Sequence, residues 1–471
     1  MKKIITALLV YAVGIAMISS AQKRPNILFI LTDDMGWGDL SCYGSKQIQT
    51  PAIDALAASG VRFIQAYVSA NVCAPSRAGI LTGRYQERFG FEHNISNPDH
   101  VKPERIGIPQ DEKLISDRLK TLGYRTGAIG KWHVGENIPE FHPLARGFDF
   151  FFGMLGGHHD YFPTVKKNEL SWGRGRPEKI RTPYLTDWFT LEAMDFIDRE
   201  SAKVTPWFLY LSYNTPHSPL QAKPEDLAAF AHIKNKQRRI YCAMQKSLDE
   251  NIARLVAHLK KSGQLNNTLL IFLNDNGGSV EVSHAINAPF NGTKGTWLEG
   301  GIRVPMMISW PGQVPAGKTC DHPVISLDVM HTIVAAAGGE VKEKTVKRGN
   351  RSYLRPNDGV DLLPFIKNPS ENRPHQTLYW RMTLRGGAIR DGDWKLILTP
   401  HHPTMLFDLS KDLSEQNNLA LTHPDKVKAL YVKYHDWCET FESNPLWISA
   451  PMWANYNDNL YDRTYQLEQP E

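Results

Sequence analysis

Runs of apolar residues that end in polar ones recur along the chain. The first, Ile27–Leu31, contains no polar residue and is followed by Thr32, Asp33 and Asp34. A strand that is apolar on both faces is typical of the middle of a sheet that helices cover on both sides. Similar runs lie in RTGAIGKWHVG, PWFLYLSYNTPHSP, TLLIFLNDNGG and VPMMISWPG, and helical patterns occupy residues 53–59, 114–122 and 240–261. This alternation predicts an α/β fold with a large mixed, mostly parallel sheet sandwiched by helices.

The pattern changes after residue 339. Residues 340–359 are charged and lack apolar periodicity, so we expect a long loop there. The segments TLYWRM, GGAIRDGDWKLILT and TMLFDLSKD follow, and they predict a short antiparallel sheet, with a helix over residues 424–441. We therefore expect an N-terminal α/β domain over residues 22–370 and a smaller C-terminal α+β subdomain over residues 371–471.

The first 21 residues have the layout of a cleaved export signal. Lys2 and Lys3 precede an apolar stretch, residues 4–18, and the small residues Ser19, Ser20 and Ala21 follow it. The stretch is marginal in length for a membrane span, although an uncleaved signal anchor is an alternative. We expect an exported protein, periplasmic or secreted, without stable membrane insertion.

Composition adds little beyond this. The 471 residues are 42% hydrophobic and 22% charged, which is ordinary for a globular protein with a large core. The formal net charge is +5, but the basic residues are scattered and form no long run. We therefore expect no nucleic-acid partner, whereas an anionic substrate is compatible with the charge.

One of the five cysteines stands in an unusual setting, NVCAPSRAGILTGRY. Proline favours the start of a helix and glycine its end, so we expect a helix from Pro75 to Gly83, with Cys73 just before it. Helix N-termini attract anions, and Arg77 can reach the same point. This favours an anion site, whereas a buried structural thiol is the alternative. If Cys73 is unpaired, three disulfide pairings or none remain open for the other cysteines, Cys42, Cys242, Cys320 and Cys438.

Oxygen ligands follow two of the predicted strands. Asp33 and Asp34 come after the first strand, and Asp275 and Asn276 come after the strand in TLLIFLNDNGG. The carboxyl ends of the strands are where open α/β sheets bind ligands. Three carboxylates in one place require a cation, and oxygen ligands favour Ca²⁺, or less readily Mg²⁺, over zinc. Each aspartate alone could instead be a turn former or a helix cap.

Four further polar residues follow strand-like runs: Lys131, His133, His217 and Lys294. Each has a structural alternative, as a solvated lysine or a hydrogen-bonded histidine. If the two lysines and Arg77 gather around a divalent ion and the three aspartates, the pocket keeps a formal charge of about +2. Such a pocket suits an anionic tetrahedral group.

Together these motifs resemble the type I, formylglycine-dependent sulfatases of the alkaline-phosphatase-like superfamily, particularly bacterial carbohydrate sulfatases. CAPSRAGILTGR is similar to the first signature of that family and GYRTGAIGKWHVG to the second, and the resemblance covers nearly the whole chain after the signal. It implies that a formylglycine-generating maturation enzyme oxidises Cys73. The hydrated aldehyde would attack the sulfur of a sulfate ester and later expel the sulfate.

The resemblance also implies roles for the other residues. Asp33, Asp34, Asp275 and Asn276 would hold Ca²⁺ together with residue 73. Arg77 would orient the nucleophile, and Lys131 and Lys294 would hold sulfate oxygens. His133 would assist deprotonation of the diol, and His217 would protonate the leaving alcohol.

Specificity is harder to read from the sequence. The resemblance suggests that one member of the group His158, His159 and Asp160 contacts a sugar, because related carbohydrate sulfatases often do so there. His401, His402 and the aromatic tail 450–466 are further candidates, with buried anchors as the alternative. Asn94, Asn266, Asn291 and Asn350 stand in glycosylation sequons. A glycan on Asn291 would crowd Lys294, so we expect Asn291 to be unmodified. Together with the short signal that begins with lysines, this favours a bacterial protein.

We therefore expect an enzyme that hydrolyses sulfate esters on a carbohydrate, such as a glycosaminoglycan, mucin-type or algal glycan fragment. A phosphoester hydrolase of the same superfamily and a non-catalytic protein that binds sulfated glycans are the alternatives. A phosphatase of this fold usually carries two zinc ions, and the sequence lacks a second ligand set. The particular sugar, the sulfated hydroxyl, exo or endo action and the oligomeric state are not specified by the sequence.

Overall fold

The computed structural model describes residues 24–95, 101–163, 170–172, 179–203, 205–342, 344–348, 351–367, 373–441, 444–448 and 456–470. The expected export signal, residues 1–21, lies outside these ranges. Within them, no helix is both long and apolar enough to cross a membrane.

A nine-stranded mixed sheet forms the centre of the molecule. In spatial order its strands are β10 (Lys318–Cys320), β2 (Val61–Phe63), β9 (Met306–Ser309), β8 (Thr268–Asn274), β1 (Asn26–Thr32), β7 (Trp207–Ser212), β4 (Arg125–Lys131), β5 (Phe150–Met154) and β6 (Ser171–Trp172). The run from β8 through β1, β7 and β4 to β5 is parallel, whereas β9 and β6 pair antiparallel with their neighbours. The predicted sheet is confirmed, and the apolar first strand lies at its middle.

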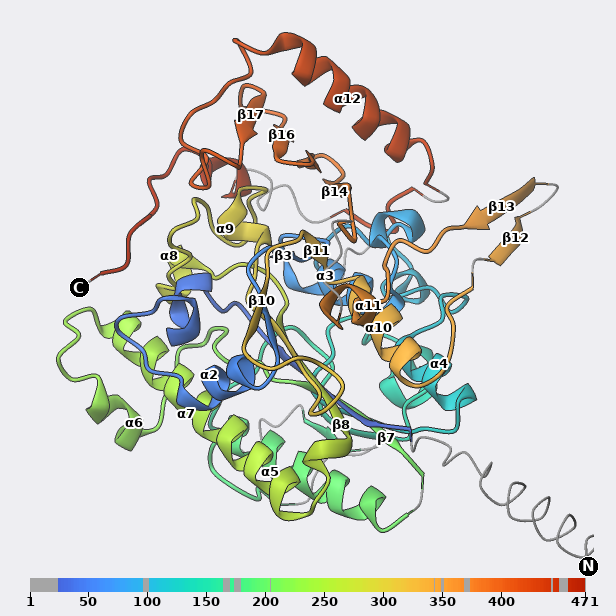
Figure 1. Ribbon diagram of the computed structural model, residues 1–471, viewed down its shortest axis with the longest axis vertical. Coiled ribbons are helices and arrows are strands. Elements are labelled where there is room, and N and C mark those ends of the chain that lie inside the picture. The colour runs from blue at the N-terminus through green and yellow to red at the C-terminus, as the bar shows by residue number, and fades with distance from the viewer. Residues whose placement is uncertain are drawn as a thin grey trace, which may run out of the picture.

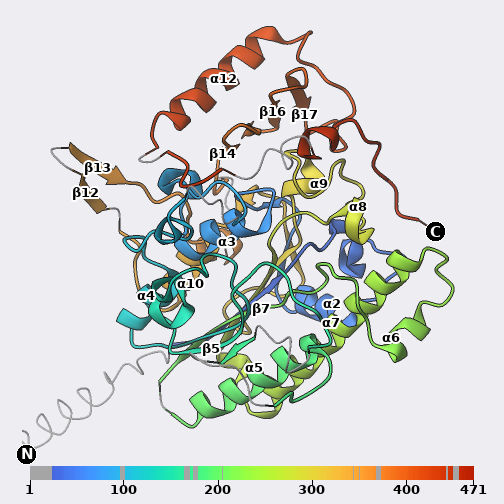
Figure 2. The same ribbon diagram turned by 180° about the vertical axis from the view of Figure 1, so that it is seen from behind.

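Helices cover both faces of this sheet (Figures 1 and 2). Successive residues of β1 point to opposite faces, so that Phe29 and Leu31 belong to one apolar cluster and Leu28 and Ile30 to the other. The first cluster packs against α3 (Cys73–Thr82), α4 (Ile115–Thr121) and α10 (Asp328–Ala336), and the second against α2 (Pro51–Ala58), α5 (Leu185–Ser201) and α7 (Lys236–Lys261).

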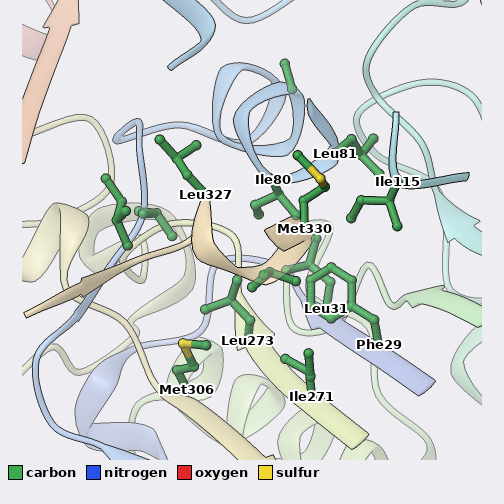
Figure 3. Close-up of a cluster of buried hydrophobic side chains, with 14 of the residues drawn as sticks. Phe29, Leu31, Ile80, Leu81, Ile115, Ile271, Leu273, Met306, Leu327 and Met330 are labelled. Atoms are coloured by element: carbon green, nitrogen blue, oxygen red, sulfur yellow. The ribbon is translucent and has the colours of Figure 1, made fainter. Parts of the chain in front are cut away.

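The side of the core that carries α3 is dense. Figure 3 shows Ile80 and Leu81 of α3 beside Met330 of α10, above the side chains of Phe29 and Leu31. All five side chains are essentially inaccessible to solvent. Apolar packing against α10 and the sheet therefore fixes the position of α3. Shorter helices occupy the connections: α6 (Pro224–Ala229), α8 (Val280–Ser283), α9 (Glu299–Ile302) and α11 (Leu363–Lys367).

A separate antiparallel sheet follows near the C-terminus, as predicted. Its order is β14 (Thr377–Met382), β15 (Gly386–Asp391), β16 (Trp394–Leu398) and β17 (Met405–Asp408), and α12 (Pro424–Cys438) packs on it. In Figure 1 this sheet and α12 lie above α9 at the top of the molecule. Trp380 of β14 donates a hydrogen bond to the carbonyl of Val68 at 2.6 Å, which ties the sheet to the larger part of the chain. The expected domain boundary at residue 370 stays a prediction.

Two smaller sheets complete the fold. β3 (Ala66–Tyr67) pairs with β11 (Val324–Ile325), and β12 (Lys344–Arg348) pairs antiparallel with β13 (Arg351–Arg355). The expectation of a long loop over residues 340–359 was therefore wrong for the two strands of this hairpin. The strands of this hairpin are charged, but they include Thr345, Val346 and Tyr353, which favour extended backbone. Periodicity fails to detect such a hairpin because its strands alternate little between apolar and polar residues.

Candidate active site

The polar residues that were predicted to converge follow four adjacent parallel strands. Asp33 and Asp34 follow β1, and Asp275 and Asn276 follow β8; their strands are in register, with Thr32 opposite Asn274. Lys131 is the last residue of β4, and His217 lies five residues after β7. Because β8, β1, β7 and β4 are neighbours and parallel, these side chains gather at one edge of the sheet.

Cys73 enters this group from α3, but from a different position than expected. It is the first residue of the helix, whose N-cap is Val72, rather than a residue that precedes it. No side chain of Val72 caps the helix; instead Asn94, from a distant loop, accepts a hydrogen bond from the N–H of Ala74 at 3.0 Å. The expected helix end at Gly83 is confirmed, since this residue is the left-handed C-cap with φ 65°.

Buried ion pairs connect the site. Lys131 Nζ lies 2.7 Å from Asp33 Oδ2, and Arg77 Nη2 lies 2.7 Å from Asp275 Oδ2. Ser212 of β7 accepts a hydrogen bond from Arg77 Nη1 at 2.5 Å, which fixes the guanidinium. These five side chains are 0% or 1% exposed, so each charge depends on its neighbours rather than on water.

The two buried aspartates differ in their proton affinity. Burial alone would raise the pKa of Asp33, but Lys131, with help from His217 and Arg77, outweighs it and lowers this pKa. Burial and the charge of Asp33 raise the pKa of Asp275 well above its usual value. The cations of the protein therefore do not fully compensate the second carboxylate, and an additional cation would do so.

The sulfur of Cys73 lies among cations at the bottom of the site. Lys294 Nζ is 3.4 Å from Cys73 Sγ and 2.8 Å from Asp34 Oδ1. Burial would raise the pKa of the thiol, but Lys131 and Lys294 outweigh it and hold the pKa well below its usual value. Residue 73 is therefore in a setting that stabilises a negative atom.

The pKa values of the two histidines of the site are shifted in opposite directions. Burial lowers the pKa of His133 to about 4, so its ring is neutral at physiological pH. Burial would also lower the pKa of His217, but Asp33 and Asp34 outweigh it and raise this pKa. His217 Nε2 lies 3.5 Å from Asp34 Oδ2.

The backbone is strained in the same region, because Asp34 and His133 have left-handed φ angles of 62° and 56°.

The oxygen atoms that could bind a metal ion at this site fit a hard divalent cation. One ligand atom from each of Asp33, Asp34, Cys73 and His217 lies within 4.8 Å of the others. Asp33 Oδ1 and Asn276 Oδ1 are buried and have no hydrogen-bond partner, although buried polar atoms normally have one. Carboxylate and amide oxygens suit Ca²⁺, whereas the soft sulfur of an unmodified Cys73 does not.

A cavity of about 540 Å³ opens above these residues. Asp34, Cys73, His133, His217 and Lys294 line it, and so does His158. His159 and Asp160 are not among the lining residues: His159 Nδ1 bonds the carbonyl of Asp160 at 2.7 Å, and Asp160 accepts a hydrogen bond from Gln221.

The other candidates for sugar contact divide in the same way. His401 and His402 do not line the cavity, and they contact Asp458 instead. Of the aromatic tail, Tyr456 lines the cavity, whereas Tyr461 and Tyr465 make hydrogen bonds inside the protein. Residues 450–455 of the tail lie outside the described ranges.

The sequence did not identify several residues of the cavity wall. They include Asn94, Glu136, Met382 and Arg385, and they come from two loops, the end of β14 and the turn after it. No motif links these segments, and only the way in which the C-terminal sheet packs on the larger part of the chain brings them together. The remaining cysteines also lack a functional pattern: all five cysteines are free, so none of the disulfide pairings is formed.

Comparison with known proteins identifies the family. Residues 25–339 match the family described as Sulfatase. The chain is 35% identical over 367 residues to the N-acetylgalactosamine-6-sulfatase of Sus scrofa, and the matched region covers 74% of this chain and 67% of that protein. The crystal structure of Ps i-CgsB has a TM-score of 0.82 at 36% identity and covers 93% of this chain and 97% of that one. The same protein in complex with k-i-k-neocarrahexaose has a TM-score of 0.81 at 37% identity, with the same coverage. The chain therefore belongs to the sulfatase family of the alkaline-phosphatase-like superfamily, and it is a sulfuric ester hydrolase.

Proposed function

We propose that this protein hydrolyses sulfate esters on a carbohydrate, with Cys73 oxidised to formylglycine and Ca²⁺ held by Asp33, Asp34, Asp275 and Asn276. The observation that carries the proposal is the setting of Cys73. Its sulfur lies 3.4 Å from Lys294 Nζ and within 4.8 Å of carboxylate oxygens of Asp33 and Asp34, where an oxygen nucleophile fits better than a thiol. A formylglycine-generating enzyme is the partner that this chemistry requires.

Each residue around Cys73 has a task in this reaction. The bound cation and the hydrated aldehyde would supply an acidic hydroxyl group as the nucleophile. Lys131 and Lys294 would hold the sulfate oxygens and stabilise the charge that develops on them. His217 would give its proton to the departing alcohol oxygen as the S–O bond breaks, and His133 would take the proton whose loss allows sulfate to leave. Arg77 would keep Asp275 in position, through the contact described above.

A carbohydrate is the substrate that the cavity and the relatives favour. The volume of about 540 Å³ is within the range of pockets that enclose small organic ligands. One relative is named for N-acetylgalactosamine, and another is known in complex with k-i-k-neocarrahexaose. Of the three residues that were expected to touch a sugar, we retain His158, because it alone of the three lines the cavity.

Matched kinetics test this function. Purified protein from a host that forms formylglycine should release sulfate from sulfated saccharides faster than it releases phosphate from the corresponding phosphate esters. Faster turnover of the phosphate esters would overturn the proposal. Mass spectrometry of the tryptic peptide 63–77 should find Cys73 as the aldehyde or its hydrate, and Cys73→Ala is the inactive control. A plain thiol in protein from the native host, together with binding but no turnover, would indicate a glycan-binding protein instead.

Export remains part of the proposal. It is based on the basic and apolar residues of segment 1–21, so it is independent of the site. Cleavage near Ala21 in the native host, detected by sequencing of the N-terminus, would support it, and retention of the segment on a membrane-bound protein would contradict it.

A further inference from the structure

Besides Lys294, one other lysine or arginine of the described residues lines the cavity, and it belongs to the C-terminal sheet. Arg385 lies in the turn between β14 and β15, and it lines the cavity together with Met382. The residue is only 7% exposed, yet its buried Nη1 has no hydrogen-bond partner. In the part of the chain that the structure describes, no carboxylate lies within ion-pair distance of it. A buried guanidinium without a counter-ion is costly, so such an arrangement needs a reason.

The other buried arginines differ from Arg385, because each of them donates at least one guanidinium N–H to a carboxylate or a carbonyl of the described residues: Arg77, Arg84, Arg88, Arg146, Arg238, Arg303 and Arg390. Arg385 therefore differs from its own class in this chain. It also lies outside the catalytic residues described above, which come from the edge of the large sheet.

The surroundings of Arg385 leave its charge available to a ligand. Burial, with a contribution from Arg385 itself, lowers the pKa of the neighbouring His93 to about 4, so this ring is neutral. Asp458 exerts some attraction on Arg385, but its carboxylate lies 3.4 Å from His401 Nε2 and beyond ion-pair distance of Arg385. Glu136 also lines the cavity, and it would repel an anion bound beside it. Lys294 and Arg385 are the lysine and the arginine among the described residues that line the cavity, and Lys294 is paired with Asp34 beside residue 73. Arg385 is therefore the cation that is left for an anionic group other than the scissile sulfate.

The local backbone holds Arg385 in this direction. The preceding residue, Leu384, has a left-handed φ of 65° and a side chain that is 66% exposed. A leucine in this conformation is strained, and because its side chain is exposed, burial of apolar surface does not offset the strain energy. The N–H of Arg385 donates to the carbonyl of Met382 at 2.8 Å and closes the turn. The strained turn thus places the arginine, rather than the leucine, on the inner side.

We propose that Arg385 binds a second anionic group of the substrate, so that the enzyme prefers saccharides that carry another sulfate or a carboxylate besides the sulfate that is cleaved. This inference rests on the proposed function. It assigns Arg385 a role in specificity: the planar guanidinium pairs with two oxygens of a sulfate or carboxylate, while the scissile sulfate lies at residue 73.

Three saccharides that share the scissile sulfate test the inference: one with no other charge, one with a second sulfate and one with a neighbouring uronate. Arg385→Met should lower kcat/KM about tenfold to a hundredfold for a doubly charged substrate. It should leave kcat/KM for the singly charged one within about twofold. Arg385→Lys should restore part of the loss. Arg373→Met, the same change at an exposed position of the same subdomain, is the matched control and should have no effect.

The outcomes separate the two proposals. Loss with the second sulfate alone, or with the uronate alone, supports the inference and identifies the anion. An equal loss with all three saccharides, or a wild-type enzyme indifferent to the second charge, overturns it. If no saccharide releases sulfate, the proposed function fails, and calorimetry with Cys73→Ala protein decides about Arg385. Tighter binding of the doubly charged saccharide that Arg385→Met abolishes would support the inference, and equal affinities would refute it.

Discussion

Replacing Lys395 by methionine should destabilise the contact between the C-terminal sheet and α9. Lys395 of β16 lies 2.8 Å from Glu299 Oε1, at the start of α9, and 2.8 Å from Glu415 Oε1, and the side chains of all three are fully buried. Without the lysine, two carboxylates stay buried beside each other. Glu299 keeps Arg303 at 3.1 Å and the hydroxyl of Tyr67 at 2.6 Å, but Glu415 keeps only the backbone N–H of Glu299.

The size of the effect follows from this geometry. Removing one partner of a buried ion pair costs about 3–5 kcal/mol, because the remaining charge is neither solvated nor paired. We expect a loss of this size in the free energy of unfolding, measured by urea denaturation at pH 7.5 with circular dichroism. The double variant Lys395→Met/Glu415→Gln should lose less than Lys395→Met alone. Glutamine avoids both the unpaired charge and the uptake of a proton that Glu415, with a pKa of about 7 beside Lys395, would otherwise need at pH 7.5.

A surface pair of the same sheet provides the control. Lys411 lies 3.1 Å from Asp408, but its side chain is 82% exposed. Lys411→Met should therefore change the free energy of unfolding by less than about 1 kcal/mol. If Lys395→Met has an equally small effect, or if the double variant is no more stable than the single one, the reasoning about the buried cluster is wrong.

Three further predictions concern single residues and the cation. Burial raises the pKa of Glu415 to about 7 from an ordinary value of 4.5, so ionisation of this carboxyl weakens the fold as the pH rises through this interval. Glu415→Gln should match the parent in thermal unfolding at pH 4 and exceed it by up to about 3 kcal/mol at pH 8; a deficit at pH 8 would contradict this. His217→Asn should lower kcat about a hundredfold or more for sugar sulfates, but much less for nitrophenyl sulfate, whose leaving group needs no proton. Equal losses on both substrates would argue against its role as an acid. Dialysis against EGTA should abolish sulfate release and lower Tm, and Ca²⁺ at about a hundred times its Kd should restore about 2.7 kcal/mol of stability. An unchanged Tm after dialysis would argue against the metal site.

The sequence predicted those parts of the fold in which local pattern and long-range packing agree. The apolar runs became β1, β4, β7 and β8, and the polar residues after them gathered at one edge because parallel neighbours end together. Strands of two or three residues, such as β2 and β6, were not identified, because they are too short to show a period.

The site was predictable to the extent that it follows strand ends. The position of Cys73 was displaced into the helix, because Asn94 supports the start of α3 from 20 residues away, and no local signal indicates this. Arg385 was missed for the same kind of reason. Its segment has the sequence of an ordinary hairpin turn, and only the packing of the C-terminal sheet brings it to the cavity.

The burial of α3 has a consequence for the order of events in the life of the protein. Every residue from Cys73 to Thr82 is buried, and Ile80 and Leu81 of this helix lie against Met330 of α10, above the sheet residues Phe29 and Leu31 (Figure 3). An enzyme that oxidises Cys73 has to bind the residues on either side of it, and in the folded protein the residues that follow Cys73 in the helix are buried. The oxidation that we propose therefore has to come first, while the segment is still extended, and a chain that folds before it meets the maturation enzyme would stay permanently inactive. Oxidation of Cys73 therefore has to precede the folding of the segment that contains it.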